Sequence, residues 1–331
     1  MKKEITLTLF CCGGAALNIA KTFYEPSSKN RKDPGFARIK TVFVDTSRSN
    51  LPKFVEEGFY QIKGTAENPV DGSGKVRGAN YKAIFNEAPE ILKQFPATDF
   101  NIVLHSGSGG SGSTLGPVLC SELLQQGKNV VVMMVGSTTC EQEIKNTINT
   151  IMSYQGISTK RELPVVAMYF ENGRCTMAEV DALVRMNILV LAATCSGENL
   201  GLDSRDLHNF INYQNVSKYK PALTGLEIYD FTMEAILKPG TAFSSVVSLV
   251  REGEDPNPGM VVGYHSYGQL SEAASQAIML PSPIFLHTVQ GYFVDVVNGL
   301  KEKQAAAERM YQNPINELSI DSAQTDDGIV L

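Results

Sequence analysis

The sequence predicts an α/β fold, with a parallel sheet in the first half of the chain and a smaller second domain after a central helix. The first half alternates strand-like runs with helical segments, which is typical of βαβ units in a parallel sheet. Strand-like runs are expected at residues 5–10, 40–44, 59–62, 100–104, 130–135 and 163–168. Helical spacing is found at residues 81–94, 115–126 and 141–155.

The pattern changes after residue 175. Apolar residues then recur three or four apart, at Met177, Val180, Val184, Ile188 and Leu191, which indicates one face of a long helix. The β-rich stretches 222–229, 242–250 and 260–267 follow, and then a helical run over about 285–311. We therefore expect a first domain (1–175), a central helix (176–200), an α+β second domain (201–284), a C-terminal helix (285–312) and an acidic tail (313–331).

Composition narrows the class of protein. Of the 331 residues 43% are hydrophobic, which is enough for a sizeable core, and the net charge of −6 argues against nucleic acid as the main partner. The six cysteines form no C-x-x-C pair and have no histidine at ligand spacing, so neither a zinc site nor a disulfide framework is predicted. No apolar run approaches the roughly 20 residues that span a bilayer. These features predict a soluble intracellular protein.

Three glycine-rich loops follow strands of the predicted sheet, at residues 12–17, 70–75 and 106–113. The last reads SGSGGSGS and leads into a helix. Parallel strands bring such loops to one edge, where glycine lets backbone N–H groups approach phosphate oxygens and a helix N-terminus favours negative charge. A flexible linker is not expected between two core elements. A Gly/Ser turn without a ligand is the alternative, and three such loops on one sheet argue against it.

Two common nucleotide-binding motifs are absent. A Walker A loop needs Ser or Thr after Gly-Lys, whereas Val76 follows Gly74 and Lys75. The dinucleotide fingerprint G-x-G-x-x-G does not follow the first strand, although Asp45 closes the second strand as an oxidoreductase of the Rossmann type would require. A phosphate loop after the fourth strand is a different arrangement.

That arrangement is found in the tubulin/FtsZ superfamily. SGGSGST (108–114) resembles its signature G-G-G-T-G-S/T-G, with Ser108, Ser111 and Thr114 as departures, and the flanking residues are more similar to phage-encoded tubulins of the PhuZ group than to bacterial FtsZ. Further matching segments are CCGGAALNIA (11–20), VDTSRSN (44–50), the loop at 71–75, LDSRD (202–206) and RMYQNPINELSIDSAQTDDGIVL (309–331). They occur in the family's order and cover nearly the whole chain, with a weaker match in the second domain.

The resemblance implies a site for GTP or GDP with Mg²⁺, for which no protein ligand of the metal is assigned. Residues 109–113 would surround the α- and β-phosphates together with Gly13 and Gly14, while Gly72 to Gly74 would sense the γ-phosphate and act as a switch. The implied nucleotide-binding residues are Gly13, Gly14, Asn18, Asp45, Gly72, Ser73, Gly74, Gly109, Gly110, Ser111, Gly112, Ser113 and Asp181.

Three of the candidate residues concern the base. Asn18 lies where the family contacts the guanine or its ribose, and a helix-start cap is the alternative. Asp181 lies where the family pairs with the guanine N1–H and exocyclic amine, which favours GTP over ATP, and a solvated carboxylate near a helix N-terminus is the alternative. Met177 either stacks on the base or packs in the core.

Asp203 and Asp206 resemble the superfamily's N-x-D-x-x-D/E loop. The resemblance implies that this pair polarises the water that attacks the γ-phosphate held by a neighbouring subunit. Gly201 replaces the family's asparagine, which puts in doubt how the water is held. Without the resemblance, the two aspartates would be interpreted as an ordinary helix cap.

The implied function is a GTPase that polymerises head to tail into dynamic filaments. Its partner is another copy of itself, and by resemblance the filaments position phage DNA or its enclosing compartment in the cytoplasm of an infected bacterium. Membrane and direct nucleic-acid contacts are not expected. A nucleotide-binding scaffold without hydrolysis and a Rossmann-type NAD(P) oxidoreductase remain as alternatives.

The C-terminal tail carries acidic and apolar residues. Asp321, Asp326 and Asp327 are followed by Ile329 and Val330, and the segment has too few apolar residues to fold alone. The resemblance implies that it reaches the next subunit as an assembly element. A disordered solubilising tail is the alternative.

Overall fold

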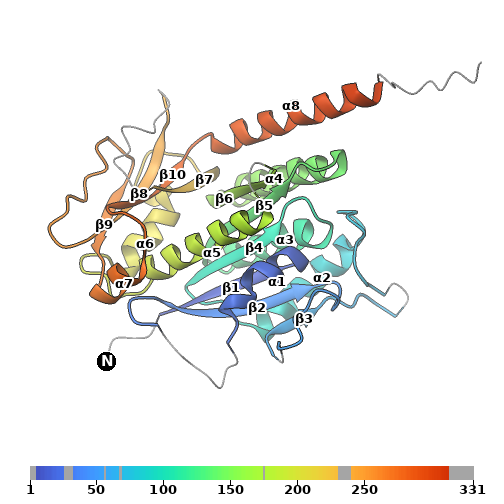
Figure 1. Ribbon diagram of the computed structural model, residues 1–331, viewed down its shortest axis with the longest axis horizontal. Helices are drawn as coiled ribbons and strands as arrows, with labels where there is room; N and C mark the ends of the chain where they lie inside the picture. Colours follow the sequence, from blue (N-terminus) through green and yellow to red (C-terminus); the bar gives the residue numbers. More distant parts are fainter. Residues whose placement is uncertain are drawn as a thin grey trace, which may run out of the picture.

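One mixed sheet between two layers of helices forms the body of the computed structural model, which describes residues 5–25, 33–55, 57–66, 69–173, 176–229 and 240–312 (Figure 1). The strands are β1 (Thr6–Cys12), β2 (Arg38–Asp45), β3 (Phe59–Gln61), β4 (Phe100–Ser106), β5 (Asn129–Ser137), β6 (Val165–Asn172), β7 (Leu223–Tyr229), β8 (Phe243–Val250), β9 (His265–Gln269) and β10 (Ile284–Val289). The helices are α1 (Gly14–Ala20), α2 (Tyr81–Gln94), α3 (Ser111–Gln125), α4 (Glu141–Arg161), α5 (Met177–Thr194), α6 (Ser204–Ile211), α7 (Glu272–Ala277) and α8 (Tyr292–Gln312).

The strand order in the sheet is β3-β2-β1-β4-β5-β6-β7-β10-β8-β9. Neighbouring strands from β3 to β7 are parallel, β10 is antiparallel to both β7 and β8, and β8 is parallel to β9. The central strands are buried on both faces. In β5, for example, every residue except Ser137 is buried, as expected of a covered parallel sheet.

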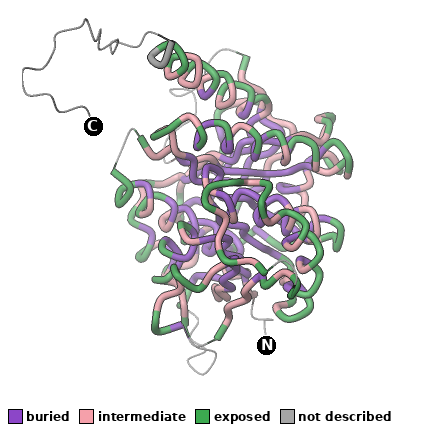
Figure 2. Tube along the Cα trace, turned by 90° about the vertical axis from the view of Figure 1, so that its right-hand side faces the viewer, coloured by how far each residue is buried: buried purple, intermediate pink, exposed green. Residues whose placement is uncertain are grey.

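Helices cover the two faces of the sheet, and the buried strands lie between them (Figure 2). Side chains of α1, α5, α6 and α7 share one apolar core with the sheet, and side chains of α2, α3, α4 and α8 share the other. The two layers hold the strand ends in fixed positions. The loops at those ends therefore project from a rigid frame.

The α/β class, the parallel sheet and the central helix are confirmed, whereas three element bounds are corrected. The helix after the fourth strand begins at Ser111 and not at Leu115, because the small residues of the glycine-rich loop already form its first turn. Residues 284–289 form the buried strand β10, and the helix predicted from about residue 285 begins only at Tyr292. In the stretch 260–267, strand structure begins at His265. The domain boundaries stay a prediction, since β6 and β7 join both halves in one sheet.

Candidate functional site

Four loops meet at the carboxyl ends of β1, β2 and β4, beside the start of α3. We call this the loop edge, formed by residues 12–14, 46–50, 71–75 and 106–113. The hydroxyl oxygen of Ser111 lies 2.6 Å from that of Thr46 and donates a hydrogen bond to that of Ser73 at 3.1 Å. Ser111 thus joins three of the loops. The prediction that the glycine-rich loops lie together is confirmed.

The first and fourth loops touch through their backbones. A Cβ atom on Gly13 would lie 3.0 Å from the backbone nitrogen of Gly112, and one on Gly112 would lie 2.7 Å from the carbonyl oxygen of Cys12. Gly13 also has a φ of +83°, which L side chains rarely adopt. Side chains at these positions would force the two loops apart. Gly110 is equally restricted, because a Cβ there would collide with the Ser73 hydroxyl.

The first turn of α3 supplies backbone N–H groups at this edge. N–H groups of a first helical turn have no acceptor within the helix, and they attract anions. The hydroxyl of Ser113 is fully buried and donates to the carbonyl of Gly110 at 2.9 Å. The Ser113 hydroxyl is therefore engaged within the first turn of α3, and the predicted contact of Ser113 with a nucleotide stays a prediction.

Arg77 ties the third loop to α3. Pro117 lies inside α3 and has no N–H, so the carbonyl of Ser113 lacks its usual helical donor. The Nε of Arg77 donates to that carbonyl at 3.3 Å, and its Nη2 donates to the Ser153 hydroxyl at 2.6 Å. In return, the Thr114 hydroxyl donates to the Arg77 carbonyl at 2.6 Å. Burial lowers the pKa of Arg77 from its usual value.

Lys75 ties the third loop to α4. Its Nζ lies 2.7 Å from Oε1 of Glu143, whose Oε2 accepts a hydrogen bond from Ser137 at 2.6 Å. Burial acts to raise the pKa of Glu143, but the bonds from Lys75 and Ser137 outweigh it and leave that pKa below its usual value. Asn146 donates to the carbonyls of Lys75 and Ser108, at 2.9 and 3.0 Å. Together these contacts fix the third and fourth loops against the same helix.

Asp45 organises the loop that follows β2. Its side chain is buried, and Oδ1 accepts a hydrogen bond from the Thr46 backbone at 2.7 Å. Burial raises the pKa of Asp45, while hydrogen bonds from Thr46 and Asn50 oppose that rise. Asn50 also lies against Gly14, where a Cβ atom would collide with it. Asp45 therefore shapes the loop edge, and its predicted contact with a nucleotide stays a prediction.

The predicted base-contacting residues lie on α1 and α5, which pack against each other. Asn18 is exposed and is the fifth residue of α1, so the alternative of a helix-start cap is wrong. Asp181 is half-buried in the second turn of α5, and burial raises its pKa against the opposing effect of Arg185 and Lys21. Met177 is 72% exposed, so core packing is also wrong for this residue. All three side chains are accessible to a ligand at this edge.

Asp203 and Asp206 lie elsewhere, at the start of α6. They form a reciprocal capping box: Oδ1 of Asp203 accepts from the backbone N–H of Asp206 at 3.0 Å, and Oδ2 of Asp206 accepts from the backbone N–H of Asp203 at 3.0 Å. Hydrogen bonds from the N–H groups of Asp206 and Arg205 lower the pKa of Asp203. The helix-cap interpretation is confirmed. The catalytic role stays a prediction beside it, because a carboxylate has lone pairs beyond those used here.

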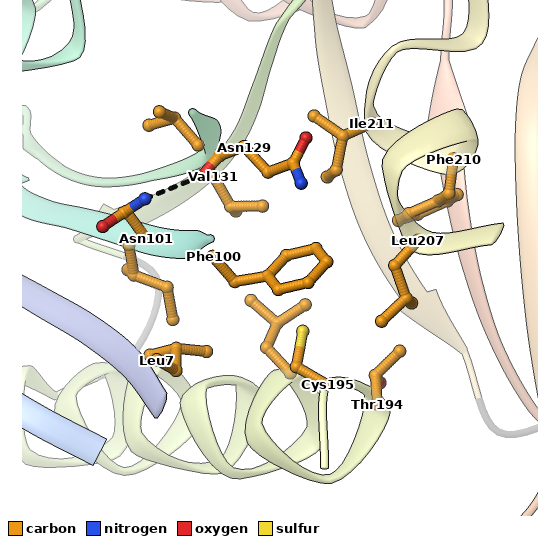
Figure 3. Close-up of a pocket in the computed structure, with 13 residues that line it drawn as sticks. Leu7, Phe100, Asn101, Asn129, Val131, Thr194, Cys195, Leu207, Phe210 and Ile211 are labelled. Carbon is orange, nitrogen blue, oxygen red and sulfur yellow. Dashed lines mark hydrogen bonds between the residues drawn. The ribbon is translucent and has the colours of Figure 1, made fainter. Parts of the chain in front are cut away.

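The apolar face of α6 anchors this capping box. Leu207 and Phe210 point toward Phe100 of β4 and toward the end of α5, around a cavity of only about 20 Å³ (Figure 3). Such a space holds about one water molecule, so this cavity is a packing defect and not a ligand site. Asn129, the first residue of β5, accepts a further hydrogen bond from Asn212 at 3.0 Å. The aspartates therefore project from a firmly seated helix.

The capping box and the loop edge lie at opposite ends of the molecule. Helix α6 packs against the amino-terminal ends of β4 and β5, whereas the loops follow the carboxyl ends of β1, β2 and β4. Helix α5 connects the two regions over 18 residues, which corresponds to about 27 Å. We call the region of Asp203 and Asp206 the α6 edge. One copy of the chain cannot bring both regions to one ligand.

Several other predictions fall outside what the structure tests. The tail residues Asp321, Asp326, Asp327, Ile329 and Val330 lie outside the described residues.

Within the described ranges, no group of three or more His, Cys, Asp or Glu side chains is arranged to hold a metal ion. No helix among them is long and apolar enough to cross a bilayer.

Sequence reasoning missed five residues that build the two edges, namely Thr46, Arg77, Glu143, Asn146 and Tyr264. One of them had a detectable signal. Pro117 in a predicted helix implies an unpaired carbonyl four residues earlier, which needs a donor from elsewhere. The other four are brought in by tertiary contacts that leave no pattern in the sequence.

Comparisons with known proteins agree with this geometry. No family model matches the chain. A phage tubulin-like protein of Pseudomonas phage PhiPA3 is 28% identical over 335 aligned positions, which cover 99% of each chain. Among solved structures, a protofilament of TubZ from bacteriophage PhiKZ has a TM-score of 0.80 at 24% identity over 96% of each chain. The GDP complex of the phage tubulin PhuZ has a TM-score of 0.80 at 21% identity, covering 99% of this chain and 100% of that one. The chain is therefore similar over its whole length to a phage tubulin-like protein, and it has the fold of the solved phage tubulins.

Proposed function

We propose that this protein is a GTPase that polymerises head to tail and hydrolyses GTP between adjacent copies. The separation of the loop edge from the α6 edge carries the proposal. The candidate phosphate-binding groups lie at one end of α5, and the carboxylates of Asp203 and Asp206 lie at the other. Stacking copies end to end places the α6 edge of one copy against the loop edge of the next. A heterologous contact of this kind does not close on itself and gives an open filament.

The ligand of the loop edge is a guanine nucleotide in this proposal. The GDP complex of the related phage tubulin supports it, and so does Asp181, whose carboxylate can accept the N1–H and amino donors of guanine. The hydroxyl oxygens of Ser73 and Ser111 would hold Mg²⁺ together with phosphate oxygens and water, a donor set that suits this ion. When bound, Mg²⁺ neutralises phosphate charge. The residues 109–113, with Gly13 and Gly14, would bind the remaining phosphate oxygens through backbone N–H groups.

Hydrolysis follows from the contact between copies. An aspartate of the α6 edge accepts a hydrogen bond from a water molecule and orients its oxygen toward the γ-phosphorus. A bond forms between that oxygen and phosphorus while the bond to the β–γ bridging oxygen breaks. GDP and inorganic phosphate are the products, and the proton passes through the carboxylate to solvent. The carboxylate of Asp203 is ionised at neutral pH and can accept a hydrogen bond from water, and hydrogen bonds from backbone N–H groups lower its pKa further.

The course of helix α8 along the molecule supports head-to-tail assembly. Strand β10 runs antiparallel to β7, so α8 begins near the α6 edge and runs back toward the loop edge. Lys303 pairs there with Glu171 near the end of β6, and between Lys301 and Arg309 no side chain of α8 is buried. The acidic tail after α8 would then reach the next copy. Within an infected bacterium, such filaments would position phage DNA or the compartment that encloses it.

Phosphate release measured against protein concentration tests the proposal. An assembling GTPase shows a threshold with GTP, below which release is negligible, and electron microscopy shows filaments above it. A scaffold without hydrolysis would form filaments and release no phosphate. A Rossmann-type oxidoreductase would show neither. Either of the last two results would overturn the proposal.

A further inference from the structure

We infer that Tyr264 is a positioning residue for hydrolysis between copies, acting through Asp206. The inference rests on the proposed function and names a residue that the motif N-x-D-x-x-D/E does not contain. The phenolic O–H of Tyr264 donates a hydrogen bond to Oδ1 of Asp206 at 2.9 Å, across 58 residues of sequence. The segment before β9 thereby contacts the start of α6.

Backbone hydrogen bonds to β8 hold the segment that carries Tyr264. Its carbonyl accepts a hydrogen bond from the backbone of Val246 at 2.8 Å, and the preceding Gly263 donates to the carbonyl of Phe243 at 3.0 Å. A side chain on Gly263 would collide with the carbonyl of Ser244, so this segment lies tightly along β8. The phenol therefore projects from a paired backbone and not from a loose loop.

The bond from Tyr264 completes the orientation of the Asp206 carboxylate. The torsion that rotates a carboxylate about its last bond is broad, so a single hydrogen bond leaves the plane free to turn. Asp206 has one bond on each oxygen, from the Asp203 backbone to Oδ2 and from Tyr264 to Oδ1. These bonds use two of about four lone-pair sites and leave others for a water molecule. Water would therefore meet lone pairs that point in a fixed direction.

Tyr264 stays a hydrogen-bond donor throughout the neutral range. Burial and the neighbouring Asp206 raise its pKa, although the side chains of Asn209 and Ser266 oppose this rise. A phenol with a raised pKa remains protonated at neutral pH. The Asp206 carboxylate therefore always has a neutral hydrogen-bond donor beside it. Tyr264 adds no charge of its own to the contact with the next copy.

The test substitutes Tyr264→Phe, which keeps the ring and removes only the hydroxyl. We expect phosphate release per polymerised subunit to fall about tenfold, which is the size of effect that the loss of a hydrogen bond to a charged group gives. The GTP affinity and the assembly threshold should stay within twofold of wild type. Tyr267→Phe is the matched control, because Tyr267 lies beside Gly201, just before α6, and is 49% exposed. We expect this substitution to change nothing.

A double-mutant cycle separates positioning from a merely structural role. If Tyr264 acts through Asp206, then Tyr264→Phe should change the residual rate less than twofold in an Asp206→Asn background. An equal fold loss in both backgrounds would overturn the inference, and so would a wild-type rate in Tyr264→Phe filaments. If Tyr264→Phe does not assemble alone, the rate of phosphate release is measured in copolymers with wild-type subunits at rising fractions of the variant. The rate should fall in proportion to that fraction. A constant rate would contradict the inference. A wild-type protein that assembles without releasing phosphate would instead refute the proposed function.

Discussion

The loop edge and the α6 edge differ in the chemical groups that they present. The loop edge is built from backbone N–H groups and from hydroxyls such as those of Thr46, Ser73 and Ser111, and Asp45, which closes β2, is buried among its own hydrogen bonds. The α6 edge presents Asp203 exposed and Asp206 half-exposed at a helix start. The carboxylates of Asp203 and Asp206 lie at the far end of α5 from the loop edge. In the proposed mechanism, this placement separates binding from hydrolysis until two copies meet.

The two edges also differ in how they are held. At the loop edge, side chains from three loops and from α4 are joined by hydrogen bonds and an ion pair, so we expect a change in one loop to affect the others. The α6 edge depends on one capping box, on the apolar face of α6 and on the phenol of Tyr264. We therefore expect substitutions at the loop edge to affect binding and stability together. Substitutions of the α6 carboxylates should affect turnover, and through the lost cap the stability of α6, with little effect on nucleotide binding.

Ser111→Asp should have the largest effect, and it changes the loop edge while the α6 edge stays as it is. The new carboxylate would lie at the first residue of α3, where a negative charge favours the helix but repels phosphate. We expect GTP affinity to fall at least about 100-fold, or about 2.7 kcal/mol. Titration of the monomer with a fluorescent GTP analogue measures it. Ser204→Asp adds the same charge at the start of α6 and should leave monomer affinity unchanged, and wild-type affinity in Ser111→Asp would refute this view of the loop edge.

Asp206→Ala removes a carboxylate from the α6 edge and leaves the loop edge as it is. Hydrolysis should fall at least about tenfold, or about 1.4 kcal/mol, while GTP binding and assembly remain, so the filaments should be static. The measurement is phosphate release per pelleted subunit. Asp99→Ala is the control, because that carboxylate lies just before β4 at the same end of the sheet and is 76% exposed. Unchanged turnover in the polymer would show that Asp206 takes no part in the reaction.

Asp181→Ala removes a charged acceptor in the second turn of α5, the end of that helix nearer the loop edge. Guanine donors left without a partner should cost roughly 1 to 3 kcal/mol of affinity. The preference for GTP over ATP should shrink, since adenine presents an acceptor at N1. Competition of both nucleotides for the monomer measures the preference. A variant that still discriminates fully would place base recognition in other residues.

Arg77→Met tests how the loop edge is held. The substitution leaves the carbonyl of Ser113 without a donor, and we expect the free energy of unfolding to fall by about 1 to 3 kcal/mol. Urea denaturation at equilibrium measures it. Lys93→Met, on the exposed side of α2, should stay within about 0.5 kcal/mol of wild type. An equal stability of both variants would mean that Arg77 does not support α3.

Acid should have the smallest effect on the loop edge. Because the folded-state pKa of Glu143 lies below its usual value, its contribution to stability is present above the usual value and is lost as the pH falls through the folded one. The difference in stability between wild type and Glu143→Gln should thus be constant near neutrality and vanish in acid. Urea denaturation at several pH values measures this difference. A difference that grows on acidification would contradict the assigned direction.

Periodicity and glycine placement were enough to predict the parallel sheet and the convergence of the loops. The same signals misled at residues 284–289, where an apolar strand runs into an apolar helix. Gly291, at a φ of +76°, marks the break between them. Contacts such as those of Arg77 and Tyr264 could not be predicted, because they join segments 36 and 58 residues apart through folded strands. The roles of Asp203 and Asp206 came from a family resemblance, since the residues alone indicate only a cap.

Mixing two inactive variants tests whether the active site is shared between two copies. Ser111→Asp subunits should bind GTP at least about 100-fold more weakly but keep the α6 edge, whereas Asp206→Ala subunits should bind GTP but lack the carboxylate. If hydrolysis occurs between copies, each variant alone should release little phosphate, whereas mixtures should recover activity with a maximum near equal amounts. Sedimentation shows that both variants enter the same filaments. Co-sedimenting filaments that stay inactive at every ratio would contradict an active site shared between two copies.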